Sequence, residues 1–144
     1  MDFLSSLNIS GSGLTAQKMR MDIISQNIAN ADVTKTESGG PYVRKQVVLR
    51  SIEGNDFRSA LDKASASIGQ GVKVEQILED SSPSVPVFDP THPDADEKGY
   101  VMMPNVNTTQ EMVDMLGASR AYEANVTAFN AVKSMAMKAL EIGR

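Results

Sequence analysis

The side chains most able to do chemistry lie in one short acidic loop, which also contains the single histidine of the chain. The candidates are Asp89, His92, Asp94, Asp96 and Glu97. Carboxylates bind divalent cations, and Asp94-x-Asp96 followed by Gly99 is distantly similar to a calcium-binding loop. Lys98 occupies a ligand position, however, and Asn105 replaces the bidentate glutamate of such a loop. We therefore expect a solvated acidic loop that holds no metal.

The same loop offers no complete catalytic arrangement. His92 would have to supply the base of any Ser-His-Asp arrangement, and the sequence has neither a G-x-S-x-G elbow nor a phosphate-binding glycine loop. The absence of cysteine excludes disulfides, zinc–thiolate sites and thiol catalysis. These observations favour a protein that is not an enzyme and that carries no cofactor.

Charge and hydropathy exclude two further classes of partner. The 144 residues carry a formal net charge of −4, whereas proteins that bind nucleic acids or anionic membranes need a basic face. No run approaches the ~18 apolar residues needed to span a membrane, and no basic segment precedes the first apolar residues, as it would in a Sec signal. We expect no nucleic-acid partner, no direct lipid insertion and no cleaved Sec signal.

Apolar residues recur at seven-residue spacing at both ends of the chain. Such spacing, with alternate steps of three and four, keeps a narrow apolar stripe on one side of a helix. A helix of this kind needs partner helices to cover it, usually in coiled-coil-like packing. The sequence therefore predicts terminal helices that pair with each other and with other copies of the chain. The expected packing residues are Leu7, Leu14, Met21, Ile24, Ile28, Met112, Met115, Tyr122, Val126, Phe129, Ala136 and Leu140.

The N-terminal helix is predicted over residues 4–30, with a weak point at Ser10-Gly11-Ser12-Gly13. Each glycine costs ~1 kcal/mol relative to alanine in a helix interior. Either the helix begins at Ser12, or the small residues allow another helix to approach closely. We favour a continuous helix.

The C-terminal helix has clear boundary signals. Thr108 followed by Glu111 is typical of a capping box at a helix start, and Gly143 stands where a terminal glycine is favoured. About 34 residues at 1.5 Å each give a rod of roughly 50 Å. Such a rod is too long for one small core to cover, so the excess length is expected to pack against something else.

The middle of the chain favours short strands. Residues 42–52 and 71–78 are rich in β-formers, while five prolines between Pro83 and Pro104 limit any strand there to 85–88 and 100–103. Residues 54–70 fit either a helix or a loop.

The predicted fold class is therefore mainly α with a small β part. Long N- and C-terminal helices pack as a coiled-coil-like pair, and a middle region of short strands and loops lies between them. The three segments are the N-terminal helix (1–31), the β/loop middle (32–105) and the C-terminal helix (106–144).

Charge is distributed unevenly along the middle region. Seven acids and no lysine or arginine lie between Glu75 and Glu97, whereas Lys35, Arg44, Lys45 and Arg50 come earlier. Both groups can be solvated faces. Alternatively, opposite patches on neighbouring copies set their register.

Several motifs resemble one family. Residues 23–31 (IISQNIANA) resemble the N-terminal signature of the flagellar rod and hook axial proteins, although Gln26 stands where the family has a smaller residue. Three further stretches narrow the resemblance to the proximal rod members of that family. They are GGPY at 39–42, HPDAD at 92–96 leading to GYV at 99–101 and PNV at 104–106, and SRAYEANV at 119–126 leading to KSM at 133–135.

The resemblance implies a structural subunit of the flagellar basal body. Such subunits leave the cell unfolded through the flagellar type III export apparatus. They stack above the membrane ring into a hollow rod, with the terminal helices lining the core. The implied partners are other copies, other rod proteins, the junction of membrane ring and export gate, and the export apparatus. A needle or filament component of another type III secretion system would share the helices but would not need the HPDAD loop.

The family motifs contribute turn and helix-end residues. We expect Asn27 and Asn30 to cap backbone groups where the first helix ends, because asparagine side chains bond readily to nearby backbone. The motif and turn positions are Asn27, Asn30, Pro41, Tyr42, His92, Pro93, Gly99, Tyr100, Pro104 and Asn105.

Overall fold

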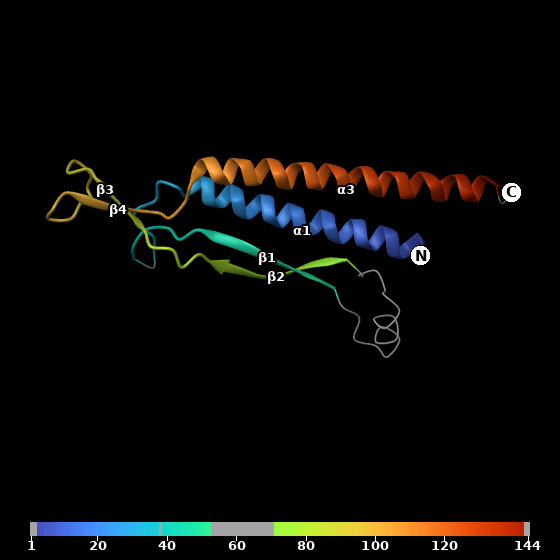
Figure 1. The fold of residues 1–144 in the computed structure, drawn as a ribbon, viewed down its shortest axis with the longest axis horizontal. Helices are drawn as coiled ribbons and strands as arrows, with labels where there is room; N and C mark the ends of the chain where they lie inside the picture. Colours follow the sequence, from blue (N-terminus) through green and yellow to red (C-terminus); the bar gives the residue numbers. More distant parts are fainter. Residues whose placement is uncertain (1–2, 38, 53–70, 143–144) are drawn as a thin grey trace.

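Two long antiparallel helices run side by side along the molecule, with a small β part on one flank and at one end (Figure 1). The computed structural model describes residues 3–37, 39–52 and 71–142. Helix α1 spans Phe3–Ala29, and helix α3 spans Thr108–Ile142. The predicted class, mainly α with a small β part, is confirmed. Within the described residues, neither helix is long and apolar enough to cross a membrane.

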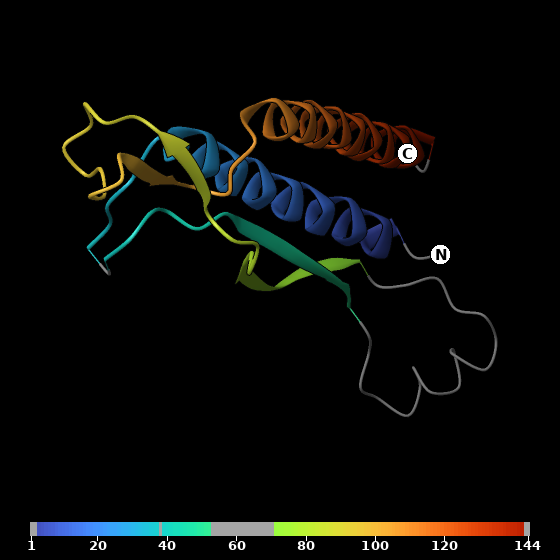
Figure 2. The same cartoon turned by 60° about the vertical axis from the view of Figure 1, so that its left-hand side comes forward.

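Four strands form two separate antiparallel hairpins (Figure 2). Strands β1 (Lys45–Ser51) and β2 (Val72–Glu79) pair with a bulge between Val48 and Leu49, and both lie against α1. Strands β3 (Val85–Phe88) and β4 (Tyr100–Met103) form a second hairpin at the end of the molecule opposite the chain termini. The prolines thus limit this hairpin to the short strands that were predicted.

The first strand begins later than predicted, at Lys45 rather than at residue 42. The amide of Tyr42 donates to the carbonyl of Val33, and the amide of Arg44 donates to the side chain of Asn105. Because these amides bond to loops and not to β2, residues 42–44 lie outside the sheet. The predicted ambiguity over residues 54–70 lies outside the described residues.

Helix α1 is continuous through its glycines, and the small residues there allow close packing, as predicted. A Cβ added to Gly13 would lie 2.9 Å from the Asn125 side chain of α3. Ser12 Oγ accepts a 3.0 Å hydrogen bond from the amide of Val72 at the start of β2. Gly71 has φ +122° and lies directly against Ser12, so a larger residue does not fit at Gly71.

The start of α3 corrects the predicted capping box. Asn107 caps the helix, because its Oδ1 accepts hydrogen bonds from the amides of Thr109 (3.1 Å) and Gln110 (3.2 Å). Glu111 does not reach back to the helix start, since its carboxylate is buried against other elements. The predicted end at Gly143 lies outside the described residues.

The two helices differ in length, with 27 residues in α1 and 35 in α3. At 1.5 Å per residue α3 is about 52 Å long, and it extends past the beginning of α1 (Figure 1). Between the helices the core is thin. Its buried side chains in the described part of the helices are Ala16, Ile23, Ile24 and Ala118, together with polar Asn27 and Glu111.

The glycines of the packed region provide a test of this close approach. We expect Gly11→Ala to raise the free energy of unfolding by up to about 1 kcal/mol, because alanine favours helix and no atom lies within 4 Å of the added Cβ. Gly71→Ala should lower it, because the residue has a positive φ and lies against Ser12. Thermal unfolding of the purified chain, followed by circular dichroism, measures both, and equal effects would contradict the packing.

Candidate assembly site and its polar hub

A buried asparagine joins α1 to the first strand. Asn27, only 1% exposed, donates from Nδ2 to the carbonyl of Lys45 (2.8 Å) and to Glu111 Oε2 (3.0 Å). Its Oδ1 accepts from the amide of Lys45 (3.0 Å) and from the hydroxyl of Tyr42 (3.0 Å). Both amide protons and both acceptor positions are therefore used. One side chain thus holds α1, α3 and β1 together.

A buried ion pair lies beside this asparagine. Glu111 is 1% exposed, and its Oε1 accepts a 2.6 Å hydrogen bond from Arg44 Nε. The Arg44 guanidinium also faces Asp80 at 3.5 Å and Asp114 at 3.8 Å. A buried charge is tolerated only when it is paired and hydrogen-bonded, and Glu111 meets both conditions.

A second asparagine extends the network to the segment before α3. Asn105 Oδ1 accepts from the amide of Arg44 (2.8 Å), and its Nδ2 donates to the carbonyls of Asp80 (3.1 Å) and Ser82 (3.0 Å). These bonds fix the end of β2 beside the start of β1. We call Asn27, Tyr42, Arg44, Asp80, Asn105 and Glu111 the polar hub.

The hub changes the acidity of its members. Burial, followed by the negative charges of Glu111 and Glu79, raises the pKa of the Tyr42 hydroxyl. Burial alone would lower the pKa of Arg44, but its hydrogen bonds with, and attraction to, Glu111 and Asp80 raise it overall. Hydrogen bonds from Ser82, and then from Arg44, lower the pKa of the Asp80 carboxyl.

The family-motif residues divide between the hub and the turns. Asn27, Tyr42 and Asn105 come together in the hub, and Asn30 caps α1 by donating to the carbonyl of Gln26 (2.8 Å). The expectation that Asn27 caps backbone groups where the first helix ends is wrong, because its side chain bonds to the backbone of Lys45 in β1 instead. Pro104 is buried directly before Asn105, and Pro41 is half-buried before Tyr42.

Three side chains of the acidic loop form hydrogen bonds within the loop or with one neighbouring loop. Asp89 accepts from the amide and hydroxyl of Thr91, and His92 Nδ1 accepts from the amide of Asp94. Asp94 accepts from the hydroxyl of Thr34 at 2.8 Å. In the described part of the chain, no three His, Cys, Asp or Glu side chains gather as a metal site would require. His92 is half-buried here, and Pro93 is exposed.

The far side of this loop returns to the second hairpin. Gly99 has φ +78°, and a Cβ there would lie 3.0 Å from the Phe88 ring. Tyr100 meets Phe88 edge to face, with ring centroids 5.3 Å apart. Both motif residues therefore shape the hairpin.

The chain itself covers the predicted packing residues unevenly. Ile24 is buried. Most of the others are half-buried, namely Leu7, Leu14, Met21, Ile28, Met115, Tyr122, Val126, Phe129 and Ala136. Met112 and Leu140, by contrast, are 53% and 75% exposed. Their role in contacts between subunits stays a prediction.

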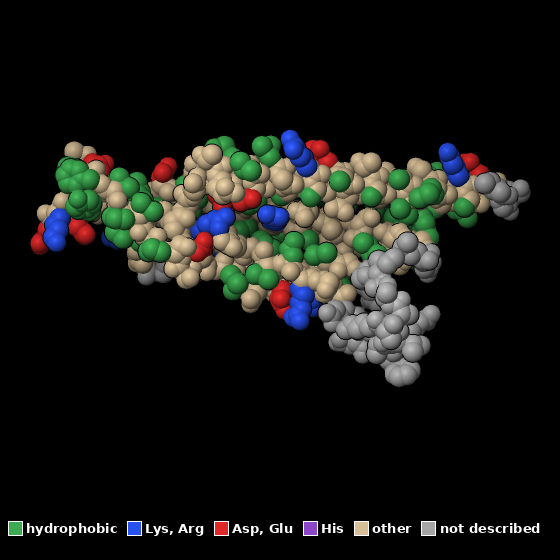
Figure 3. Space-filling view, in the orientation of Figure 1, with side chains coloured by type: hydrophobic (Ala, Val, Ile, Leu, Met, Phe, Trp, Pro, Cys, Tyr) green, Lys and Arg blue, Asp and Glu red, His purple; other side chains and the backbone are tan. Residues whose placement is uncertain are grey.

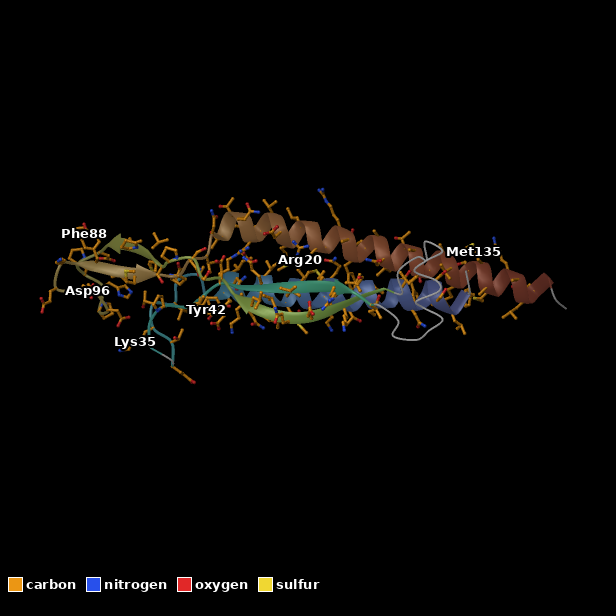
Figure 4. The ribbon with its side chains drawn as sticks, turned by 60° about the horizontal axis from the view of Figure 1, so that its bottom comes forward. Arg20, Lys35, Tyr42, Phe88, Asp96 and Met135 are labelled. Carbon is orange, nitrogen blue, oxygen red and sulfur yellow. The ribbon has the colours of Figure 1, made fainter. Side chains whose placement is uncertain are left out.

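A groove of about 240 Å³ lies between α1, α3 and β1, directly beside the hub. Its apolar wall includes Ile23, Val47 and Leu49, and its charged rim includes Arg20 and Asp114. Arg20 lies beside α3 near the middle of the molecule (Figure 4), 3.9 Å from Asp114. The groove is thus an opening in the same helix–hairpin junction.

Sequence reasoning missed two central hub residues. It placed Arg44 in a basic cluster, and it gave Glu111 a capping role at the helix start. One available signal was the position of Glu111, four residues before Met115 and therefore on the same side of the helix as that stripe residue. It also missed Ala16 and Ala118, which are buried where the helices come closest.

Comparison with known proteins points consistently to one family. A family model described as flagella basal body rod protein matches residues 7–35, and one described as flagellar basal body rod FlgEFG protein C-terminal matches residues 97–142. Both matches include a helix and part of the hub.

Relatives match over nearly the whole chain, and each is named flagellar basal-body rod protein FlgC. The protein of Bacillus subtilis (strain 168) is 51% identical, covering 96% of this chain and 97% of that protein. The protein of Borreliella burgdorferi is 47% identical, covering 99% and 98%. The protein of Salmonella typhimurium (strain LT2) is 40% identical and covers both chains completely.

Removing the buried carboxylate tests the hub. We expect Glu111→Ala to lower the free energy of unfolding by about 3 kcal/mol, because Arg44 loses its 2.6 Å partner and one buried amide proton of Asn27 is left unpaired. Asp114→Ala, on the same helix, should cost less than about 1 kcal/mol, because its contacts are long and partly exposed. Denaturant unfolding measures both, and equal losses would contradict the assigned role of Glu111.

The pKa directions predict how stability depends on pH. The lowered pKa of Asp80 adds to the free energy of unfolding above pH ~3.9, the pKa of an unfolded Asp, and this stabilisation is lost as the pH falls below that value. The raised pKa of Tyr42 adds to the free energy of unfolding below pH ~10, the pKa of an unfolded Tyr, and this stabilisation is lost as the pH rises further. Melting temperatures across pH 2–12 measure both effects. Tyr42→Phe should flatten the alkaline decline, and an unchanged decline would contradict this origin.

Proposed function

Since this chain belongs to the FlgC family of flagellar basal-body rod proteins, we propose that it builds the proximal part of the rod by packing its terminal helices against those of neighbouring subunits. It is a structural subunit of the flagellar basal body and assembles with other basal-body components. In the proposal the packed helices form the hollow drive shaft that transmits torque, and no catalytic step is involved.

The observation that carries the proposal is the incomplete cover of the helix stripes. Met112 and Leu140 belong to the predicted stripe on α3, yet they are 53% and 75% exposed. An apolar stripe that continues beyond its cover indicates a surface for another protein. Because α3 extends past the beginning of α1 (Figure 1), no other helix or strand of the described residues lies beside its C-terminal end.

We propose that the helical and β segments of the chain have different places in the rod. Residues 1–31 and 106–144 supply the helices of the shaft, and residues 32–105 supply the β/loop region, which faces outward. The polar hub fixes the angle between these parts, because Asn27 bonds α1 to β1 and Glu111 bonds α3 to Asn27 and to Arg44, directly before β1. The stripe residues are then presented in one fixed orientation to each neighbour.

The proposed export route and the proposed assembly partners rest on the same family membership. We propose that the chain leaves the cytoplasm unfolded through the flagellar type III export apparatus. It then joins other copies, other rod proteins and the junction of membrane ring and export gate. A needle or filament component of another secretion system is the alternative. The full-length relatives, all named as rod proteins, favour the flagellar role.

A charge placed on the uncovered part of the stripe tests the proposed interface. Met112→Asp puts a carboxylate where a neighbouring helix is expected, at a cost of several kcal/mol in each contact. It should abolish rods and swimming while leaving the chain folded, because Met112 is exposed in the single chain. The measurements are swimming in soft agar and basal bodies counted in electron micrographs.

Thr109→Asp is the matched control, an exposed position in the same first turns of α3. Both carboxylates interact favourably with the helix N-terminus. A difference in rod formation or swimming between the two variants therefore arises from the contact with the neighbouring subunit. Normal rods and swimming with Met112→Asp would contradict the interface.

A further inference from the structure

The second hairpin is apolar on both faces. Pairing places Val85 with Met103 and Val87 with Val101 on one face, and Pro86 with Met102 and Phe88 with Tyr100 on the other. A hairpin with one face in water normally alternates apolar with polar residues. The first face is partly covered: Val101 is buried and Met103 half-buried, while Val85 and Val87 are 51% and 40% exposed. On the second face all four residues are exposed, with Phe88, Tyr100 and Met102 at 64%, 44% and 43%. We call this second face, with Pro86, the hairpin face.

The hairpin face lies at one extreme of the molecule (Figure 3). Among the described helices and strands, β3 and β4 pack only against each other. Two strands alone are marginally stable in water, so a partner that covers the hairpin face would also stabilise the hairpin. Residues 85–103 carry four acids (Asp89, Asp94, Asp96, Glu97) and one lysine, a formal charge of −3. The face therefore has an acidic border.

The opposite extreme of the molecule carries a complementary surface. In Figure 4, Phe88 and Asp96 lie near one end and Met135 lies toward the other. Met137 (55% exposed) and Leu140 (75% exposed) are three residues apart on the overhanging end of α3, and Lys133 precedes Met137 by one turn. With Lys138 and Glu141, residues 133–142 have a formal charge of +1. We call Lys133, Met137 and Leu140 the helix-end patch.

We propose that the hairpin face docks against the helix-end patch of a second copy of this chain. The inference rests on the proposed rod function and names one of its contacts. Both surfaces are apolar at the centre, and their charges are opposite. Because they lie at opposite ends of one chain, a contact between two copies is head to tail, and such a contact builds an open helical filament where its rotation does not close.

A photo-crosslinking residue at Met102 tests the contact in cells. Benzoylphenylalanine replaces Met102, basal bodies are isolated after irradiation, and mass spectrometry maps the attached peptide. The expected product joins Met102 to residues 133–142 of a second copy, and attachment to a different rod protein would overturn the proposed contact. The same probe at Val113, 58% exposed on α3, is the control and should not attach there.

Charge reversal provides the second arm. Asp96→Lys with Glu97→Lys should reduce the Met102 product several-fold, whereas Glu123→Lys, exposed in the middle of α3, should leave it unchanged. Where the Met102 probe prevents assembly, Phe88 carries it instead.

Attachment to any other segment, the same product from Val113, or no product from assembled rods would overturn the proposed contact. These three outcomes leave the rod function intact, since they are read from basal bodies that contain the chain. Absence of the unsubstituted chain from isolated basal bodies would instead contradict the rod function itself.

Discussion

The structure depends on one buried group of hydrogen bonds between the side chains of Asn27, Glu111 and Arg44. The apolar core between the helices is thin, so apolar burial alone does not fix how the helices and the first hairpin are oriented. Directional bonds to a buried carboxylate supply that orientation, because the cost of leaving any of them unmade is large. Polar side chains thus occupy part of the core, and their directional bonds define how the helices and the first hairpin are oriented.

That geometry suits a subunit that is completed by its neighbours. Half-buried stripe residues stabilise the single chain only in part, and the exposed Met112 and Leu140 on α3 leave apolar surface for another subunit. The hairpin face adds another such surface at the opposite end. In the proposed assembly, contacts between subunits supply the apolar burial that a chain of 144 residues with few aromatic side chains lacks.

Periodicity in the sequence predicted both helices, and proline positions predicted the two short strands, because these signals are local. The hub was only partly predictable. Asn27, Tyr42 and Asn105 stood out through the family motifs, but their meeting point depends on contacts between segments up to 84 positions apart, such as Asn27 and Glu111. Glu111 was misread because an acid three residues after Thr108 satisfies the local capping pattern. In the folded chain the Glu111 carboxylate bonds to Arg44 and not to the backbone amide at the helix start.

The most direct test of the hub is a double-mutant cycle between Asn27 and Glu111. Denaturant unfolding of Asn27→Ala, Glu111→Ala and the double variant gives their coupling free energy. If the two side chains act as one unit, the losses are strongly non-additive, with a coupling of about 1–3 kcal/mol. Additive losses would contradict the claim that this buried contact between α1 and α3 sets the arrangement on which the assembly surfaces depend.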